Sequence, residues 1–221
     1  MTYKIRLTLK SDTTFGRGDG VAGLIDAEVE HDEYGLPYLR GRALKGLLRE
    51  ECDNVLFALE QMGKPGNWPK KADELFGIGG SSLGEDAKMH VGDAVLPEDL
   101  RRAVYYEIKR KDAQLTAEEI LDSLTAIRRQ TAISEQGAPK EGSLRSMRVV
   151  LRETVFEADV TFARDFQPTD EEIILLGTCC RALQRVGLGR NRGRGKVETK
   201  LLYIGDITGD CIDLFEEKLK Q

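Results

Sequence analysis

The N-terminal part of the chain contains two different spacings of apolar residues. Between residues 3 and 9, every second side chain is apolar. Since successive side chains of a strand point to opposite faces, this alternation predicts a half-buried β-strand. From residue 43 to residue 59, apolar residues recur every three or four positions, and a glycine and a proline follow soon afterwards. This second spacing predicts an amphipathic helix that ends near residue 62.

The remainder of the chain switches between the same two spacings. Residues 88–97 predict a strand ended by a proline, and helices are expected at about 98–111 and 117–128. The spacing Thr-x-x-Glu of a capping box opens the second of these helices. Residues 144–163 alternate twice, which predicts a hairpin or two paired strands. A second capping box at Thr169 and Glu172 opens a helix that extends to Val186, and residues 196–204 predict a last strand.

The order of these elements predicts the fold class. The outline is strand, helix, strand, insertion, two strands, helix, strand. It indicates an α+β protein with a ferredoxin-like (RRM-like) antiparallel sheet, helices on one face and long insertions. No internal repeat of 20–50 residues is visible and no change of composition marks a boundary. We therefore expect residues 1–221 to form a single domain.

Charge is unevenly distributed along a chain whose formal net charge is only -5. Residues 185–196 contain five basic side chains and no acidic one, and residues 128–152 contain six basic and two acidic side chains. Such segregation is typical of a protein that binds a polyanion on one face. The four cysteines lack the C-x-x-C spacing of a zinc site and are interpreted as small buried hydrophobic residues.

The expected location is the cytoplasm. The N-terminal segment alternates instead of forming the apolar region of a signal peptide. The sequence also has no run of about 18 apolar residues, which a membrane-spanning helix needs. A membrane is therefore not among the expected partners.

The segment from Val186 to Glu198 combines glycines with positive charge. Glycine allows a positive φ and the close approach of another backbone, and consecutive amides in such turns form anion-binding concavities. A Walker phosphate loop is excluded because no Gly-Lys-Ser/Thr follows, and a dinucleotide fingerprint would precede its helix. The segment predicts contact with a nucleic-acid backbone, with a solvated surface turn as the alternative. Its candidate residues are Gly187, Gly189, Arg190, Arg192, Gly193, Arg194, Gly195 and Lys196.

Three further segments carry a resemblance to a known family. Residues 35–51 (GLPYLRGRALKGLLREE) lead into the predicted first helix, and the overlapping residues 23–37 (GLIDAEVEHDEYGLP) come before them. The third segment, residues 126–160, begins at the end of the helix predicted at 117–128. Together with the glycine-rich segment, they resemble RAMP-superfamily proteins, most of all the backbone subunits of type III CRISPR RNA-guided effector complexes. In that family, residues 126–160 would form a projecting basic thumb. Residues 62–115 resemble nothing specific.

The resemblance implies a function and a set of partners. The protein would bind guide RNA and cleave complementary target RNA with Asp26 as the catalytic, metal-recruiting residue. The cofactor would be a divalent ion, magnesium or manganese, bound only once RNA supplies further oxygen ligands. Partners would be guide RNA, target RNA, other subunits of the effector complex, and copies of the protein itself in a filament. Outside the glycine loop, the expected RNA-binding residues are Arg42, Lys45, Arg49, Arg145 and Arg148.

Several alternatives stay open at this point. Asp26, Glu28, Glu30 and Asp32 recur at every second position, and in an extended segment they would form an acidic solvated edge. The protein would then be a non-cleaving structural RNA-binding subunit of the same assembly. A guide-processing endoribonuclease with His31 or His90 as general base is a further reading. An unrelated RNA-recognition module would need exposed aromatic residues on its sheet, and the predicted strands have few.

Overall fold

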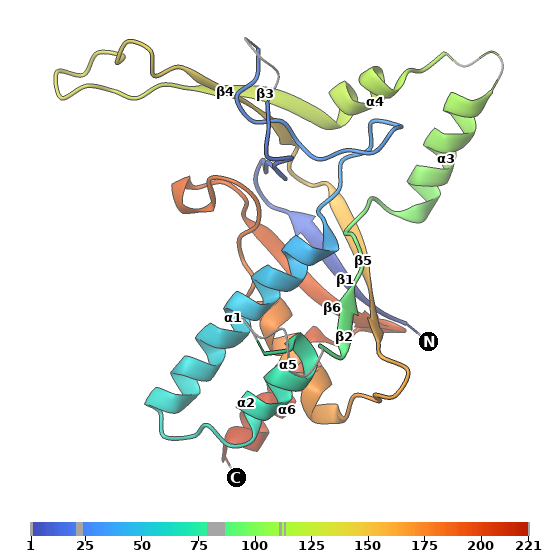
Figure 1. Ribbon diagram of the computed structural model, residues 1–221, viewed down its shortest axis with the longest axis vertical. Coiled ribbons are helices and arrows are strands. Elements are labelled where there is room, and N and C mark those ends of the chain that lie inside the picture. Colours follow the sequence, from blue (N-terminus) through green and yellow to red (C-terminus); the bar gives the residue numbers. More distant parts are fainter. Residues whose placement is uncertain (1, 21–23, 79–86, 111, 113, 221) are drawn as a thin grey trace.

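A five-stranded antiparallel sheet forms the centre of the computed structural model, which describes residues 2–20, 24–78, 87–110, 112 and 114–220 (Figure 1). The strand order is β2-β5-β1-β6-β7. Together with two helices, the first four strands follow the β-α-β-β-α-β order of a ferredoxin-like fold, so the predicted α+β class is confirmed. These elements are β1 (Tyr3–Leu9), α1 (Gly41–Gln61), β2 (Met89–Val91), β5 (Val155–Phe162), α5 (Asp170–Ala182), β6 (Val197–Tyr203) and the short edge strand β7 (Gly205–Asp206).

The two faces of the sheet differ as the alternation in the sequence predicts. Ile5, Leu7 and Leu9 of the central strand β1 are fully buried. Arg6 points to the opposite face, where its guanidinium forms an ion pair with Glu157 of β5 at 2.6 Å. Ion pairs between neighbouring strands, and not aromatic rings, therefore occupy this second face.

Four helices pack against one another and against the apolar face of the sheet (Figure 1). They are α1, α5 and two helices that the sequence analysis did not predict, α2 (Trp68–Phe76) and α6 (Thr208–Lys220). Trp68 and Phe215 join these two, with ring centroids 4.8 Å apart. All four cysteines are buried with free thiols, as expected of small core residues.

A long insertion separates β2 from β5 and projects from the body of the molecule (Figure 1). It contains α3 (Glu98–Lys109), α4 (Ala117–Leu124) and a hairpin of β3 (Thr125–Gln130) and β4 (Arg145–Val150). The predicted helix at 117–128 is therefore wrong in its last residues. Thr125 ends the helix by donating its hydroxyl to the carbonyl of Leu121 at 2.6 Å, and the chain then pairs with β4.

The predicted pairing within residues 144–163 is also wrong. The first half forms β4 of the projecting hairpin, and the second half forms β5 of the main sheet. Between them, Glu153 adopts a left-handed conformation with φ of 68°, which redirects the chain from one sheet to the other. The hairpin thus spans residues 125–150, and the C-terminal part of the expected 126–160 thumb belongs to the main sheet.

Candidate functional site

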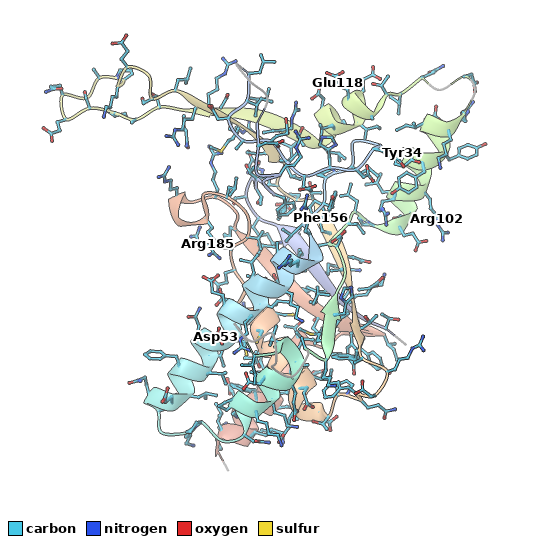
Figure 2. All side chains as sticks on the ribbon, in the orientation of Figure 1. Tyr34, Asp53, Arg102, Glu118, Phe156 and Arg185 are labelled. Carbon is cyan, nitrogen blue, oxygen red and sulfur yellow. The ribbon has the colours of Figure 1, made fainter. Side chains whose placement is uncertain are left out.

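The glycine-rich loop between α5 and β6 is held in a defined shape. Its glycines at 187, 189, 193 and 195 all have positive φ, between 71° and 82°, as their residue type suggests. The amide of Leu188 donates to the carbonyl of Thr14 at 2.9 Å. Arg185 lies at the loop in Figure 2 and donates from its guanidinium to the carbonyls of Arg190 and Arg194, at 3.1 and 3.5 Å. The loop is therefore built to present backbone and arginines in a fixed arrangement.

A pocket of about 520 Å³, here called the basic pocket, lies between this loop and the base of the projecting hairpin. Its described lining residues include four arginines and a single carboxylate, so their formal charge favours an anion. Its lining residues are Asp26, Ala27, Gln130, Arg145, Ser146, Met147, Gly187, Leu188, Gly189, Arg190, Arg192 and Arg194. Seven of these residues are among those predicted from the sequence, and they come from three distant segments of the chain.

Asp26 lies in the wall of the basic pocket, fixed to strand β4. Its Oδ2 accepts hydrogen bonds from the amide (2.6 Å) and the hydroxyl (3.3 Å) of Ser146, and its own amide donates to the Ser146 carbonyl at 2.8 Å. Its other oxygen, Oδ1, makes no hydrogen bond with the described residues. The side chain is exposed. One carboxylate oxygen is thus positioned by the hairpin while the other is available to a ligand.

The four arginines of the basic pocket differ in how firmly they are held. Arg190 forms a two-pronged ion pair with Glu50 of α1, at 3.0 and 3.2 Å. Arg194 donates to the sulfur of Met147 and so bridges the loop to the hairpin. Within the described part of the chain, the guanidinium groups of Arg145 and Arg192 make no hydrogen bond or ion pair, and both side chains are exposed. These two cations are the most readily available to a phosphate.

The three basic residues predicted on α1 do not line the basic pocket. Arg42 is exposed and makes no ion pair within the described residues. Lys45 donates to the carbonyl of Met89 at 2.7 Å, and burial lowers the pKa of its ammonium group. Arg49 donates to Asp53 at 2.8 Å and to the carbonyl of Gly77 at 3.0 Å, so it connects α1 with the end of α2. Lys45 and Arg49 therefore stabilise the fold through internal contacts.

Two other predicted residues also point away from the basic pocket. Arg148 is nearly buried, and its guanidinium lies 3.0 Å from Glu28 and 2.6 Å from Asp122. Lys196 is exposed, but it lines a different hollow beside α6. The thumb and the glycine loop thus each contribute some of their basic residues to the site and use others elsewhere.

The acidic residues that follow Asp26 do not form a solvated edge. Glu28 and Glu30 are buried, at 4% and 8% exposure, and pair with Arg148 and Arg40 respectively. Burial alone would raise the pKa of Glu30, but hydrogen bonds from Arg40 and Tyr38 outweigh it and lower the pKa. Oδ1 of Asp32 accepts the amides of Tyr34 and Leu36 at 2.9 and 3.0 Å. Asp26 is the only one of the four that lines the basic pocket.

Several residues of the site could not be found from the sequence. Ser146 fixes Asp26, Met147 contacts Arg194, and Glu50 pairs with Arg190. Each partner lies more than 40 positions away, and no local motif marks these residues. The described residues contain no group of three or more His, Cys, Asp or Glu side chains suited to a metal ion. Among the described residues of the basic pocket, a metal ion would therefore find one carboxylate, that of Asp26.

A family model of the RAMP superfamily matches residues 6–198. The chain belongs to the RAMP superfamily. The predicted family is confirmed, because the match covers most of the chain and includes the second half of β1, all of α1, the hairpin and the glycine loop. A comparison with curated protein sequences gives no significant match.

Solved structures similar to this RAMP protein include two cryo-EM structures of the Type III-B Cmr-beta. A chain of the form bound to cognate target RNA is 13% identical, with a TM-score of 0.62, and the match covers 96% of this chain and 99% of that chain. A chain of the apo state is also 13% identical, with a TM-score of 0.61 and coverage of 91% and 97%. At this identity the similarity establishes a shared fold over nearly the whole length of both chains.

Proposed function

We propose that this RAMP protein is a subunit of a type III CRISPR effector complex and binds guide RNA in the basic pocket. The observation that carries the proposal is the convergence of four arginines and the glycine loop on one pocket. The similar chains come from the Type III-B Cmr-beta, one of them bound to cognate target RNA, which supports RNA and other subunits as partners. Target RNA is the second expected nucleic acid.

The proposed binding mode is contact with the RNA backbone. Guanidinium groups match phosphate geometry, and exposed loop amides donate hydrogen bonds to anionic oxygens. The described residues that line the basic pocket include no aromatic side chain, so they offer no stacking platform for bases. Sequence recognition is then left to base pairing between the guide and its target, as in RNA-guided systems generally.

A salt series tests guide binding. Replacing Arg190, Arg192 and Arg194 with alanine should weaken binding of RNA of any sequence and flatten the dependence of affinity on salt by about one unit of slope per lost phosphate contact. A matched control replaces three arginines far from the pocket, two of them in or next to α3: Arg102, Arg110 and Arg164. Equal affinity of the loop variant and the control variant at every salt concentration would refute the proposed site.

We further propose that Asp26 takes part in cleavage of target RNA. Oδ1 would hold one position of a magnesium or manganese ion, which phosphate oxygens of the RNA would complete, because the described residues supply only one carboxylate at this place. When bound, the ion would polarise a phosphoryl oxygen. Ser146 keeps the Asp26 carboxylate in a constant orientation at the pocket wall.

Substitution by asparagine separates the charge of Asp26 from its structural role. The amide oxygen of Asp26→Asn still accepts from Ser146, so guide binding and assembly should stay unchanged while cleavage falls about a hundredfold or more. The assay uses labelled target RNA, the assembled complex, and magnesium or manganese. Undiminished cleavage by the Asp26→Asn complex would remove Asp26 from the mechanism.

A non-cleaving structural subunit is the second candidate. The observation in its favour is that Asp26 already has a structural task, since it holds the segment before α1 against strand β4. In this case the wild-type complex would leave the target intact, and Asp26→Ala would lower thermal stability. A guide-processing endoribonuclease has no support in the geometry, because neither His31 nor His90, its candidate general bases, lines the basic pocket.

The proposed location is the cytoplasm, where RNA-guided defence would meet its target. The four free thiols fit a reducing compartment. In the described part of the chain, the helices are too short or too polar to cross a membrane.

A further inference from the structure

A second pocket of about 460 Å³, here called the neutral pocket, lies on the other side of the glycine loop, against α1. Its volume is in the range of about 300–1,000 Å³ found for small-ligand sites. Its walls are mostly apolar, and its charged groups are two ion pairs, Arg40–Glu30 and Arg190–Glu50. The residues that form its apolar wall are Phe15, Leu39, Ala43, Leu47 and Leu188.

Gly46 lines this neutral pocket from the second turn of α1. A glycine inside a helix is unfavourable relative to alanine, so such a position calls for a physical reason. Packing among the described residues gives none, because a Cβ added at Gly46 would meet none of their atoms within 4 Å beyond its chain neighbours and its own helix backbone. The missing side chain instead leaves the backbone of α1 bare where it faces the pocket.

Both pockets share the loop residues Gly187, Leu188 and Arg190. A nucleotide bound at the loop can therefore reach both of them. The basic pocket, with its excess of arginines, suits the phosphate. In the neutral pocket, Arg40 and Arg190 are already paired with Glu30 and Glu50, so this pocket attracts a phosphate less. The neutral parts of the nucleotide suit the apolar wall, where Leu188 is 49% exposed.

We propose that the neutral pocket receives the base and ribose of one nucleotide of the bound RNA, packed against the bare backbone of α1 at Gly46. The inference rests on the proposed RNA binding and adds where one base goes. Every base has an apolar face, so the pocket would take any of the four. It would be independent of sequence, as is the phosphate contact on the other side of the loop.

The first test is the stability of the protein without RNA. Gly46→Ala should raise the melting temperature by about 2 °C, because alanine favours the helix and meets no protein atom. Gly209→Ala is the matched control, since Gly209 is also a helical glycine with open space around it, in α6. It should stabilise the protein without changing RNA affinity. A melting temperature lowered by Gly46→Ala would mean that the fold itself needs this glycine, and would overturn the argument.

The second test compares an RNA oligonucleotide with an abasic ribose-phosphate oligomer of the same length. Wild-type protein should prefer the RNA, because the base buries apolar surface against the wall of the pocket and the abasic oligomer has no base to bury. Gly46→Leu places a side chain in the neutral pocket and should lose about tenfold or more in RNA affinity with little change for the abasic oligomer. Equal affinity of Gly46→Leu and wild type for RNA would overturn the inference and leave the proposed function standing.

Other outcomes are equally decisive. If Gly46→Leu weakens RNA and the abasic oligomer to the same extent, the pocket holds backbone and not a base, which refutes the inference. If free nucleoside monophosphates bind wild type but not Gly46→Leu, and RNA shows no advantage over the abasic oligomer, the ligand is a free nucleotide and the RNA assignment is wrong. If wild type binds no RNA in the assembled complex, the proposed function fails and the inference fails with it.

Discussion

At the scale of single residues, two arginines on the same strand have opposite surroundings. Arg148 is nearly buried against Glu28, whereas Arg145 is exposed at the basic pocket. Arg148→Ala should therefore lower the free energy of unfolding by about 3 kcal/mol, because it leaves Glu28 buried without its partner. Arg145→Ala should leave stability unchanged and reduce the salt slope of RNA binding by about one. Denaturant unfolding and a binding titration on both variants check this; a reversal of the two effects would contradict the assignment.

The glycines of the loop provide a second comparison at this scale. Gly193 and Gly195 both have positive φ, of 82° and 72°, but a Cβ at Gly195 would lie 1.9 Å from the carbonyl oxygen of Val186, while one at Gly193 meets nothing within 4 Å. Gly193→Ala should cost only the strain of a left-handed residue, about 1 kcal/mol. Gly195→Ala must also displace backbone and should cost about 3 kcal/mol or more. Calorimetric melting of both proteins measures the difference, and similar costs would show that the loop adapts.

At the scale of elements, the start of α5 depends on a buried carboxylate. Burial alone would raise the pKa of Glu172, but hydrogen bonds from Lys71 of α2 and from Thr169 outweigh it and lower the pKa to about 2. The carboxylate is 1% exposed and lies 2.7 Å from the Lys71 ammonium group. A capping interaction and a contact between two helices thus rely on the same side chain.

This arrangement predicts an acid dependence of stability. Because the folded pKa is below the unfolded value of 4.5, the stabilisation is fully present above pH 4.5 and is lost as the pH falls towards 2. The shift corresponds to about 3 kcal/mol. Glu172→Gln should remove this part of the pH dependence, so the gap in unfolding free energy between wild type and variant should narrow between pH 4.5 and pH 2. A constant gap over that range would show that Glu172 does not titrate as described.

At the scale of the whole molecule, the distal part of the hairpin contributes least to the buried core. In this distal part, Ile133 and Leu144 are 71% and 65% exposed. The two strands form a sheet of their own, which is bridged to the body at its base, where β4 contacts Thr13 and Ala27. Figure 1 shows the hairpin extending far beyond the main sheet and its helices. The filament of copies expected from the sequence would use such an arm, with each copy reaching onto the next along the guide RNA in a head-to-tail contact.

Shortening the hairpin tests this assembly. Replacing residues 131–144 with a two-residue turn should leave the melting temperature nearly unchanged, because the removed segment contributes no buried core residue. The particle formed with guide RNA and partner subunits should become smaller, as measured by light scattering after size exclusion. An unchanged particle size would show that copies do not contact one another through the hairpin, and a protein that stays monomeric in all mixtures would refute the filament.

The sequence by itself determined the features that depend on neighbouring residues. The alternation in β1 and the helical spacing in α1 yield the ferredoxin-like order, because each element buries one face that its own spacing defines. Positive φ in the glycine loop follows from the residue type. Residues 117–128 and 144–163 differ from the expected structure. Pairing with distant segments decides there between helix and strand, and between one sheet and two.

Only the tertiary structure decided which charged residues form the site. Asp26 reaches the basic pocket because Ser146, 120 positions away, holds it there, and Arg148 is withdrawn from it by Glu28 at the same separation. Local sequence places basic residues on the thumb and the loop but does not say which of them point towards one another. That choice depends on how β4, the glycine loop and the segment before α1 pack together, because a buried charge must find its partner wherever the fold brings one.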